Sequence, residues 1–194
     1  MKLPRRKFLH LAASAAVLPD LSRGAWAQAY PNRPVRAVVA FAPGGVTDTF
    51  GRLMAQKLTE QFGKQFYVEN IAGASGYIAW RNVAASTPDG YTLLMAENAI
   101  AIRSGFKDMT PTFDPVRELD SVASVAHSPL ALCVADAVPV NSVKELIAYS
   151  HSSGKTLNYA SAGTGSVAQL VWEVVKDGAK IDALSVPYRG GGPA

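Results

Sequence analysis

Two glycine-rich turns contain the residues of this 194-residue chain that are best suited to binding chemistry. The first glycine turn is Phe41–Asp48, of sequence FAPGGVTD. Its glycines allow the backbone a sharp bend close to a ligand. A helix predicted after it would present unpaired N–H groups and the positive end of its dipole. The turn therefore predicts a site for a carboxylate or a phosphate, although an ordinary Pro-Gly-Gly turn of an α/β protein fits this stretch equally well.

The second glycine turn is Ser161–Ser166, of sequence SAGTGS. It follows a strand predicted at 156–160 and precedes a helix whose apolar face is Val167, Leu170, Val171, Val174 and Val175. If two lobes face each other, the two glycine turns can hold one anion from two sides. Clefts between domains are common sites for small ligands.

An alternative function uses the same residues. The segment Gly163–Ala168 fits the dinucleotide-binding pattern G-x-G-x-x-G/A, and it lies between a predicted strand and a predicted helix. A dinucleotide-binding unit also requires an acidic residue at the end of the next strand, where this chain has Pro187–Tyr188–Arg189. An exported dinucleotide-binding oxidoreductase is therefore the alternative hypothesis.

The elements that position the first glycine turn are predicted by periodicity. Strands are expected at 35–41, 65–69 and 91–96, and helices at 47–62 and 76–86. Phe50, Leu53, Met54 and Leu58 form the expected apolar face of the first helix, and Ile78, Ala79 and Val83 that of the second. This β-α-β-α-β order predicts parallel strands with right-handed crossovers.

The rest of the chain predicts a passage into a second lobe. Residues 97–115 are expected to form an irregular ligand loop, and 119–126 and 130–135 to form two strands. A capping box at Ser142–Glu145 predicts a helix that Gly154 ends, and a later helix is expected to stop at Gly178 before a strand at 183–188. The predicted division is lobe 1 (N-terminal part) at 28–125 and a partial lobe 2 at 126–194.

The N-terminus has the pattern of an export signal. Basic residues precede an apolar run, Phe8–Leu18, and Ala25–Trp26–Ala27 predicts cleavage after Ala27. The segment Arg5–Leu9 fits a twin-arginine signal, so we expect a periplasmic protein. The chain has 19 basic and 15 acidic residues; the signal takes five basic and one acidic, which leaves 14 of each. No basic excess remains for nucleic acid.

Cysteine and histidine usage argues against redox and metal chemistry. The single cysteine, Cys133, lies in an apolar run and is expected to be a buried, inert thiol. His127 and His151 have no partner at metal-ligand spacing, so the sequence predicts no metal site. We also expect no cofactor and no catalysis.

Several segments, in order, resemble one family of proteins. The resemblance runs from Tyr30 to Ala194 and lies in short motifs: Tyr30–Arg36, Phe41–Asp48, Val68–Asn70, Pro88–Leu94, Phe113–Val116, Asn158–Gly163 and Val186–Gly190. The chain is similar to the Bug family, the extracytoplasmic solute receptors of tripartite tricarboxylate transporters. Each motif is short, but their shared order makes the resemblance specific.

The resemblance implies a two-lobed α/β fold, like that of periplasmic binding proteins (type II-like), that closes on a small carboxylated organic solute. It implies membrane transporter subunits as partners, and we expect a monomer that binds no nucleic acid. The ligand-binding candidates lie in the two glycine turns and in the loop after 91–96. They are Gly44, Gly45, Thr47, Asp48, Glu97, Asn98, Gly163, Thr164, Gly165 and Ser166.

The sequence departs from the family pattern in residue types and in length. Gln169 stands where the family often has His, and Ala42 where a second proline is usual. Glu97–Asn98 stands where small residues are common. A carboxylate at Glu97 would repel an anion, or it would select a ligand with an amide, hydroxyl or amine. The alternative, that the Glu97 side chain points to solvent, has equal weight. Family members are longer, so we expect an incomplete second lobe and weak closure-dependent binding.

Overall fold

The computed structural model describes residues 29–103 and 113–194. The export signal expected at 1–27 lies outside these residues. Arg33–Ala194 forms one compact unit. In the described ranges no helix combines the length and the hydrophobicity needed to cross a bilayer.

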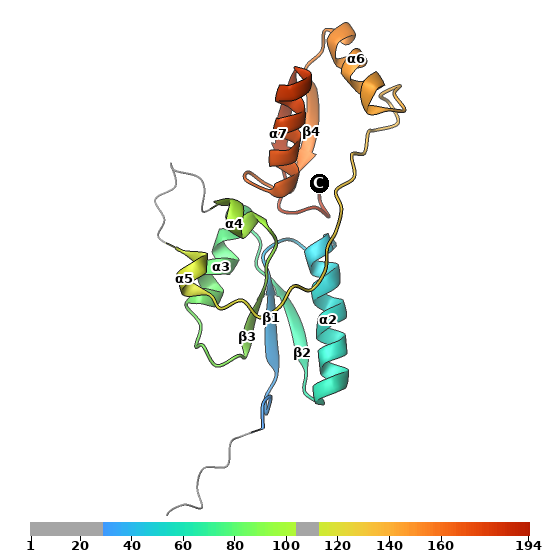
Figure 1. The fold of residues 1–194 in the computed structure, drawn as a ribbon. Coiled ribbons are helices and arrows are strands. Elements are labelled where there is room, and N and C mark those ends of the chain that lie inside the picture. The colour runs from blue at the N-terminus through green and yellow to red at the C-terminus, as the bar shows by residue number, and fades with distance from the viewer. Residues whose placement is uncertain (1–28, 104–112) are drawn as a thin grey trace, which may run out of the picture. The chain divides into compact units, whose positions relative to one another are not determined.

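A three-stranded parallel sheet forms the first half of this unit (Figure 1). The chain passes through β1 (Val35–Val39), α2 (Val46–Phe62), β2 (Phe66–Asn70), α3 (Tyr77–Ala84) and β3 (Thr92–Met95). The spatial order is β2-β1-β3, and both neighbours of β1 run parallel to it. The expected β-α-β-α-β unit is therefore confirmed, with ends within two residues of those predicted.

The central strand β1 is buried on both faces. Val35 packs with Ala55 of α2 and Phe66 of β2, whereas Val38 packs with Trp80 and Val83 of α3. Alternate residues of a strand point to opposite faces, so a strand that is covered on both sides must be apolar throughout. This explains why the run from Val35 to Ala40 contains a single charged residue, Arg36.

The helix faces differ from those expected. In α2 the buried residues are Asp48, Gly51 and Ala55, and Leu53 is 49% exposed. A Cβ on Gly51 would lie 3.1 Å from Val39 Cγ2, so small residues allow this helix to approach the sheet closely. In α3 the prediction was wrong for Ile78, which is 50% exposed, because Ala79, Trp80 and Val83 form the buried side.

A two-stranded parallel sheet carries the second glycine turn. It pairs β4 (Leu157–Ser161) with β5 (Ala183–Pro187), and α7 (Val167–Ala179) connects the two strands. Before β4, α6 (Val143–Ser153) begins at Ser142, whose hydroxyl accepts from Glu145 N–H at 3.2 Å, and ends at Gly154 as predicted. Helix α7 continues past Gly178 and ends where Lys180 takes a left-handed conformation, so the predicted stop was wrong.

The strands predicted at 119–126 and 130–135 do not form. Residues 119–142 contain neither helix nor strand, and every residue from Asp120 to Ala137 is exposed. Cys133 is exposed with them, so the prediction of a buried thiol was wrong. An apolar run becomes a strand only where a neighbour completes its hydrogen bonds, and none does so in the described part of the chain.

One short helix occurs within the segment expected to be irregular, 97–115, and a second begins at its last residue. They are α4 (Ala99–Arg103) and α5 (Pro115–Glu118), which begins at Asp114 as its N-cap. The 104–112 part of the expected loop lies outside the described residues. The lobe boundary expected between 125 and 126 falls in the exposed segment after α5 and stays a prediction.

Candidate functional site

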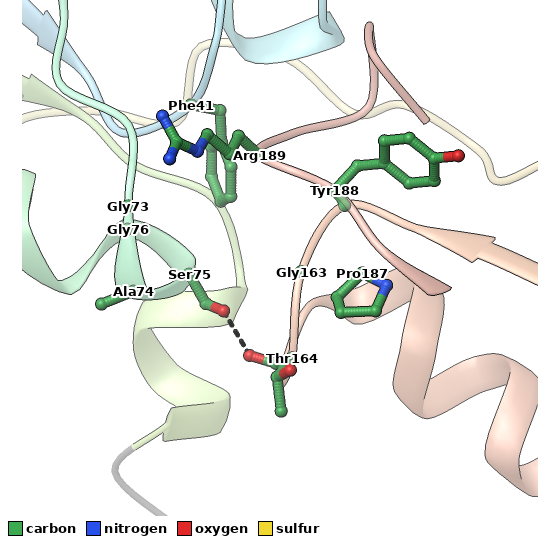
Figure 2. A pocket seen from close by; sticks show the side chains of 11 residues that line it. Phe41, Gly73, Ala74, Ser75, Gly76, Gly163, Thr164, Pro187, Tyr188 and Arg189 are labelled. Carbon is green, nitrogen blue, oxygen red and sulfur yellow. Dashed lines mark hydrogen bonds between the residues drawn. The ribbon is translucent and has the colours of Figure 1, made fainter. Parts of the chain in front are cut away.

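The loops that follow the three parallel strands end at one edge of the first sheet. They are the first glycine turn after β1, Ile71–Gly76 after β2 and Ala96–Asn98 after β3. Ligands of parallel α/β sheets bind at this carboxyl edge. A cavity of about 360 Å³ lies there, lined by Phe41, Gly73, Ala74, Ser75, Gly76, Ala162, Gly163, Thr164, Pro187, Tyr188 and Arg189 (Figure 2).

One wall of the cavity has an unusual backbone. Ala74 and Ser75 have positive φ angles of 47° and 56°, which residues other than glycine rarely adopt. Such conformations persist where the surroundings hold them, and they concentrate at functional sites. Ser75 Oγ points at the second glycine turn and donates a hydrogen bond to the Thr164 carbonyl (Figure 2). Sequence reasoning missed Ser75, for which the flanking glycines Gly73 and Gly76 were the available signal.

Glycine is required on the facing wall. A Cβ on Gly163 would lie 3.0 Å from Ser75 Oγ and 3.3 Å from the Tyr188 carbonyl oxygen, and its φ of 130° is unfavourable for other residues. Gly163 therefore allows the second glycine turn, the end of β5 and the Ser75 loop to meet.

Asp48 holds the first glycine turn in shape. Its side chain is buried, and its carboxylate accepts from Gly44 N–H at 3.0 Å, Arg52 Nε at 3.0 Å and Asn70 Nδ2 at 2.9 Å. Burial raises the pKa of Asp48, but these hydrogen bonds and the Arg52 charge outweigh burial and lower it below its usual 3.8. The carboxylate is engaged with the protein, so Asp48 acts as a positioning residue.

Asn70 ties this network to the sheet. Its Nδ2 also donates to the Phe41 carbonyl at 3.0 Å, and its Oδ1 accepts from Arg52 at 3.0 Å. The end of β1, the start of α2 and the end of β2 are thus joined by one group of hydrogen bonds. Sequence reasoning singled out neither Arg52 nor the function of Asn70, because neither residue is special in its local sequence.

The second glycine turn is held in the same way. Gln169 Oε1 accepts from Gly165 N–H at 2.6 Å, and Ser166 Oγ accepts from Gln169 N–H at 3.3 Å. In both glycine turns, the N–H group of a glycine therefore donates a hydrogen bond to a side chain four residues later in the sequence. The sequence predicts unpaired N–H groups at these turns, but the amides of Gly44 and Gly165 are paired with side chains of the protein.

The glycines near the end of the chain pack on the first glycine turn. Ala42 N–H donates to the Arg189 carbonyl at 2.9 Å. A Cβ on Gly192 would lie 2.8 Å from the Pro43 carbonyl oxygen, and one on Gly45 would lie 3.6 Å from Gly192 N. This contact of backbone on backbone is possible only without side chains.

Glu97 lies beside the first glycine turn. Its half-buried carboxylate accepts from Thr47 Oγ1 at 3.4 Å. Burial raises the pKa of Glu97 above its usual 4.5, and the Thr47 hydrogen bond offsets part of that increase. Asn98 is exposed, and its carbonyl accepts from the backbone N–H groups of Ala101 and Ile102 in α4.

The sequence-predicted residues thus fall into three groups. Gly163 and Thr164 line the cavity, whereas Gly44, Gly45, Asp48, Gly165 and Ser166 shape the two glycine turns. Thr47 and Glu97 form a pair beside the first turn, and Asn98 is turned to solvent. Among the described residues no group of three His, Cys, Asp or Glu side chains could hold a metal ion.

Comparison with known proteins identifies the family. Residues 50–194 match the model of the tripartite tricarboxylate transporter family receptor. Protein BugT of Bordetella pertussis is 34% identical over 171 residues, which cover 87% of this chain and 52% of BugT. The chain spans just over half the length of the curated relatives it matches, 57% and 56% for two others.

Solved structures agree. The structure described as R. palustris Rpa4515 with adipate matches with a TM-score of 0.81 and 35% identity, over 84% of this chain and 55% of that one. MatC from Rhodopseudomonas palustris with bound malate matches with a TM-score of 0.73 and 32% identity, over 84% and 56%. The chain therefore belongs to the tripartite tricarboxylate transporter receptor family, which includes the Bug proteins, and has the α/β fold of periplasmic binding proteins.

Proposed function

We propose that the protein is a periplasmic receptor that captures a small carboxylated organic solute for a tripartite tricarboxylate-type transporter and performs no catalysis. The observation that carries this proposal is the composition of the cavity. Arg189 is its one charged lining residue, and no ion pair engages the Arg189 side chain in the described part of the chain. A cavity with one available cation favours an anionic ligand.

The surroundings of Arg189 suit a carboxylate. Its guanidinium can donate two parallel hydrogen bonds to one carboxylate, and the neighbouring glycines expose backbone to the ligand. Two similar structures are described with adipate and with malate, which are both dicarboxylates. That agreement supports a carboxylated solute without specifying which one this chain binds.

Titration of the purified protein with carboxylates and their amides tests the proposal. Malate, adipate and citrate are compared with the corresponding neutral amides. Binding is monitored by the fluorescence of Trp80, whose ring lies next to cavity-lining Gly76. We expect the acids to bind and the amides not to bind. Arg189→Gln should weaken binding about 10- to 100-fold, as expected for loss of a charged hydrogen bond.

The control is Arg117→Gln, which removes an exposed arginine outside the cavity and should leave affinity unchanged. Equal binding of acids and amides, or an absence of binding by all of the acids, would contradict the proposal. NAD is included because the alternative, an oxidoreductase using Gly163–Ala168, requires it; a response to NAD alone would favour that alternative. Periplasmic location is tested by Arg5→Lys with Arg6→Lys, which should retain the protein in the cytoplasm.

A further inference from the structure

The side chain of Ser75 joins two loops that come from different sheets. Ser75 lies in the loop after β2, and its Oγ donates a hydrogen bond to the carbonyl of Thr164 in the second glycine turn, 89 residues later (Figure 2). Both residues line the cavity. A Cβ on Gly163 would lie 3.0 Å from Ser75 Oγ, so the two loops are in close contact here. The hydroxyl of Ser75 therefore connects two facing walls of the cavity.

A second link joins loops of the same two sheets. Ala42 N–H donates to the Arg189 carbonyl at 2.9 Å, and glycine backbone packs beside this bond, because a Cβ on Gly190 would lie 3.2 Å from Ala42 N. Figure 2 shows Arg189 at the other end of the cavity from the Ser75 hydroxyl. The link at Ala42 is made by closely packed backbone, whereas the link at Ser75 depends on a side-chain hydroxyl. The Ser75 link is therefore the weaker of the two.

Two features favour opening of the Ser75 link. Ser75 is half-buried and Thr164 is exposed, so water can compete for the hydroxyl and for the carbonyl. A neutral hydrogen bond that water can replace contributes little net free energy. Ala74 and Ser75 also hold positive φ angles of 47° and 56°, and the cost of these angles is released when the loop relaxes. The hydrogen bond opposes that strain, so the closed and open arrangements of the loop are close in free energy.

We propose, resting on the proposed receptor function, that Ser75 is the latch of the cavity. The bond from its hydroxyl to the Thr164 carbonyl holds the second glycine turn against the loop after β2 while no solute is bound. When the bond opens, this end of the cavity widens, and the backbone contact between Ala42 and Arg189 acts as the pivot. Ser75 is thus a positioning residue that controls access to the cavity.

Hydrogen exchange of the full chain without solute, measured by mass spectrometry on residues 161–169, tests the latch. Ser75→Ala removes the hydroxyl and keeps the strained backbone. Exchange should become about 3- to 10-fold faster, as the loss of one neutral hydrogen bond predicts. Ala74→Gly keeps the hydroxyl and relieves the strain, so exchange should become about threefold or more slower. Both variants leave the sequence of 161–169 unchanged, so differences in exchange report the latch.

The matched control is Ser86→Ala. Ser86 is also half-buried, and its Oγ donates to the backbone carbonyl of Asn82 at 2.8 Å, but it lies just after α3 and does not line the cavity. Exchange at 161–169 should therefore equal that of wild type. Exchange in β1 reports global unfolding, and Ser75→Ala should leave it unchanged.

Unchanged exchange at 161–169 in Ser75→Ala, or an increase that β1 shares equally, overturns the latch. If Ser75→Ala does not fold, Ala74→Gly decides, and exchange at 161–169 that is not slower overturns the inference. The experiment uses no solute, so its result is separate from the titration that tests the receptor function. Failure of every acid to bind overturns that function, whereas the exchange data decide whether Ser75 holds the two walls together.

Discussion

The carboxylate of Asp48 accepts a hydrogen bond from the backbone N–H of Gly44, at 3.0 Å, across the turn that begins helix α2. The second glycine turn repeats this arrangement with an amide side chain in place of a carboxylate. A polar residue four positions ahead thus fixes each glycine in the conformation the turn needs. Each turn is therefore shaped by the protein itself, which would reduce the ordering that the proposed ligand has to bring about.

Asp48→Asn should destabilise the fold at pH 7 by about 1–3 kcal/mol, because Gly44, Arg52 and Asn70 lose a charged acceptor. The lowered pKa of Asp48 means that its contribution is complete above the usual 3.8 and is lost as pH falls through the folded-state value. Denaturant melts from pH 7 to pH 2 should show the variant and wild type converging in acid. Asp177→Asn, at an exposed residue paired with Lys180, should melt like wild type.

Gln169→Ala should cost about 1 kcal/mol, because it leaves Gly165 N–H without its acceptor, while the backbone N–H of residue 169 still donates to Ser166 Oγ. Hydrogen exchange at Gly165 should accelerate, which separates a local loosening from a general loss of stability. Gln61→Ala, in the exposed last turn of α2, serves as the control. Unchanged exchange at Gly165 would show that Gln169 does not hold the turn.

Gly192→Ala should disturb the contact with the first glycine turn, whereas Gly191→Ala should be tolerated. A methyl group at 192 would lie 2.8 Å from a backbone carbonyl oxygen, but one at 191 meets nothing within 4 Å. Backbone cannot move aside as a flexible side chain can, so we expect a loss of about 1–3 kcal/mol for the first variant only. Thermal melts of both variants measure the difference. Equal melting temperatures would show that the glycines near Gly192 do not pack on the first glycine turn.

Glu97→Gln should raise stability at neutral pH. The raised pKa of Glu97 means that the folded state holds its proton more tightly than the unfolded chain does. Wild-type stability should therefore decline as pH rises from 4.5 through the folded-state value, and remain reduced above it. Melts between pH 4 and pH 8 should show that the variant is more stable than wild type at pH 7 and equally stable near pH 4. A variant that is less stable at pH 7 would contradict this.

The chain shows clearly where local sequence is sufficient. The apolar run of β1 and the alternation of strands and helices after it predicted a parallel sheet, which formed. Ser142 predicted the start of α6, and the positions of the two glycine turns follow from their own residues. Periods of two and 3.6 residues and end caps are properties of a few neighbouring residues, so a short window contains them.

The same local patterns failed where a partner decides the outcome. The run at 130–135 has the composition of a strand but finds no neighbouring strand in the described residues, so it stays exposed. The predicted buried face of α2 was wrong because the helix lies close to the sheet. The small residues Gly51 and Ala55 fit there, and larger apolar residues do not. Propensity is therefore secondary to packing in both cases.

The sequence by itself determined the family, the first sheet and the positions of the two glycine turns. Only the tertiary structure decided which contacts each residue in those turns makes. Asp48 positions its turn because Asn70, 22 residues away, lies beside it, and Ser75 reaches Thr164 across 89 residues of chain. Such contacts depend on how whole elements pack, and the free energy that selects one packing is summed over many residues far apart in sequence.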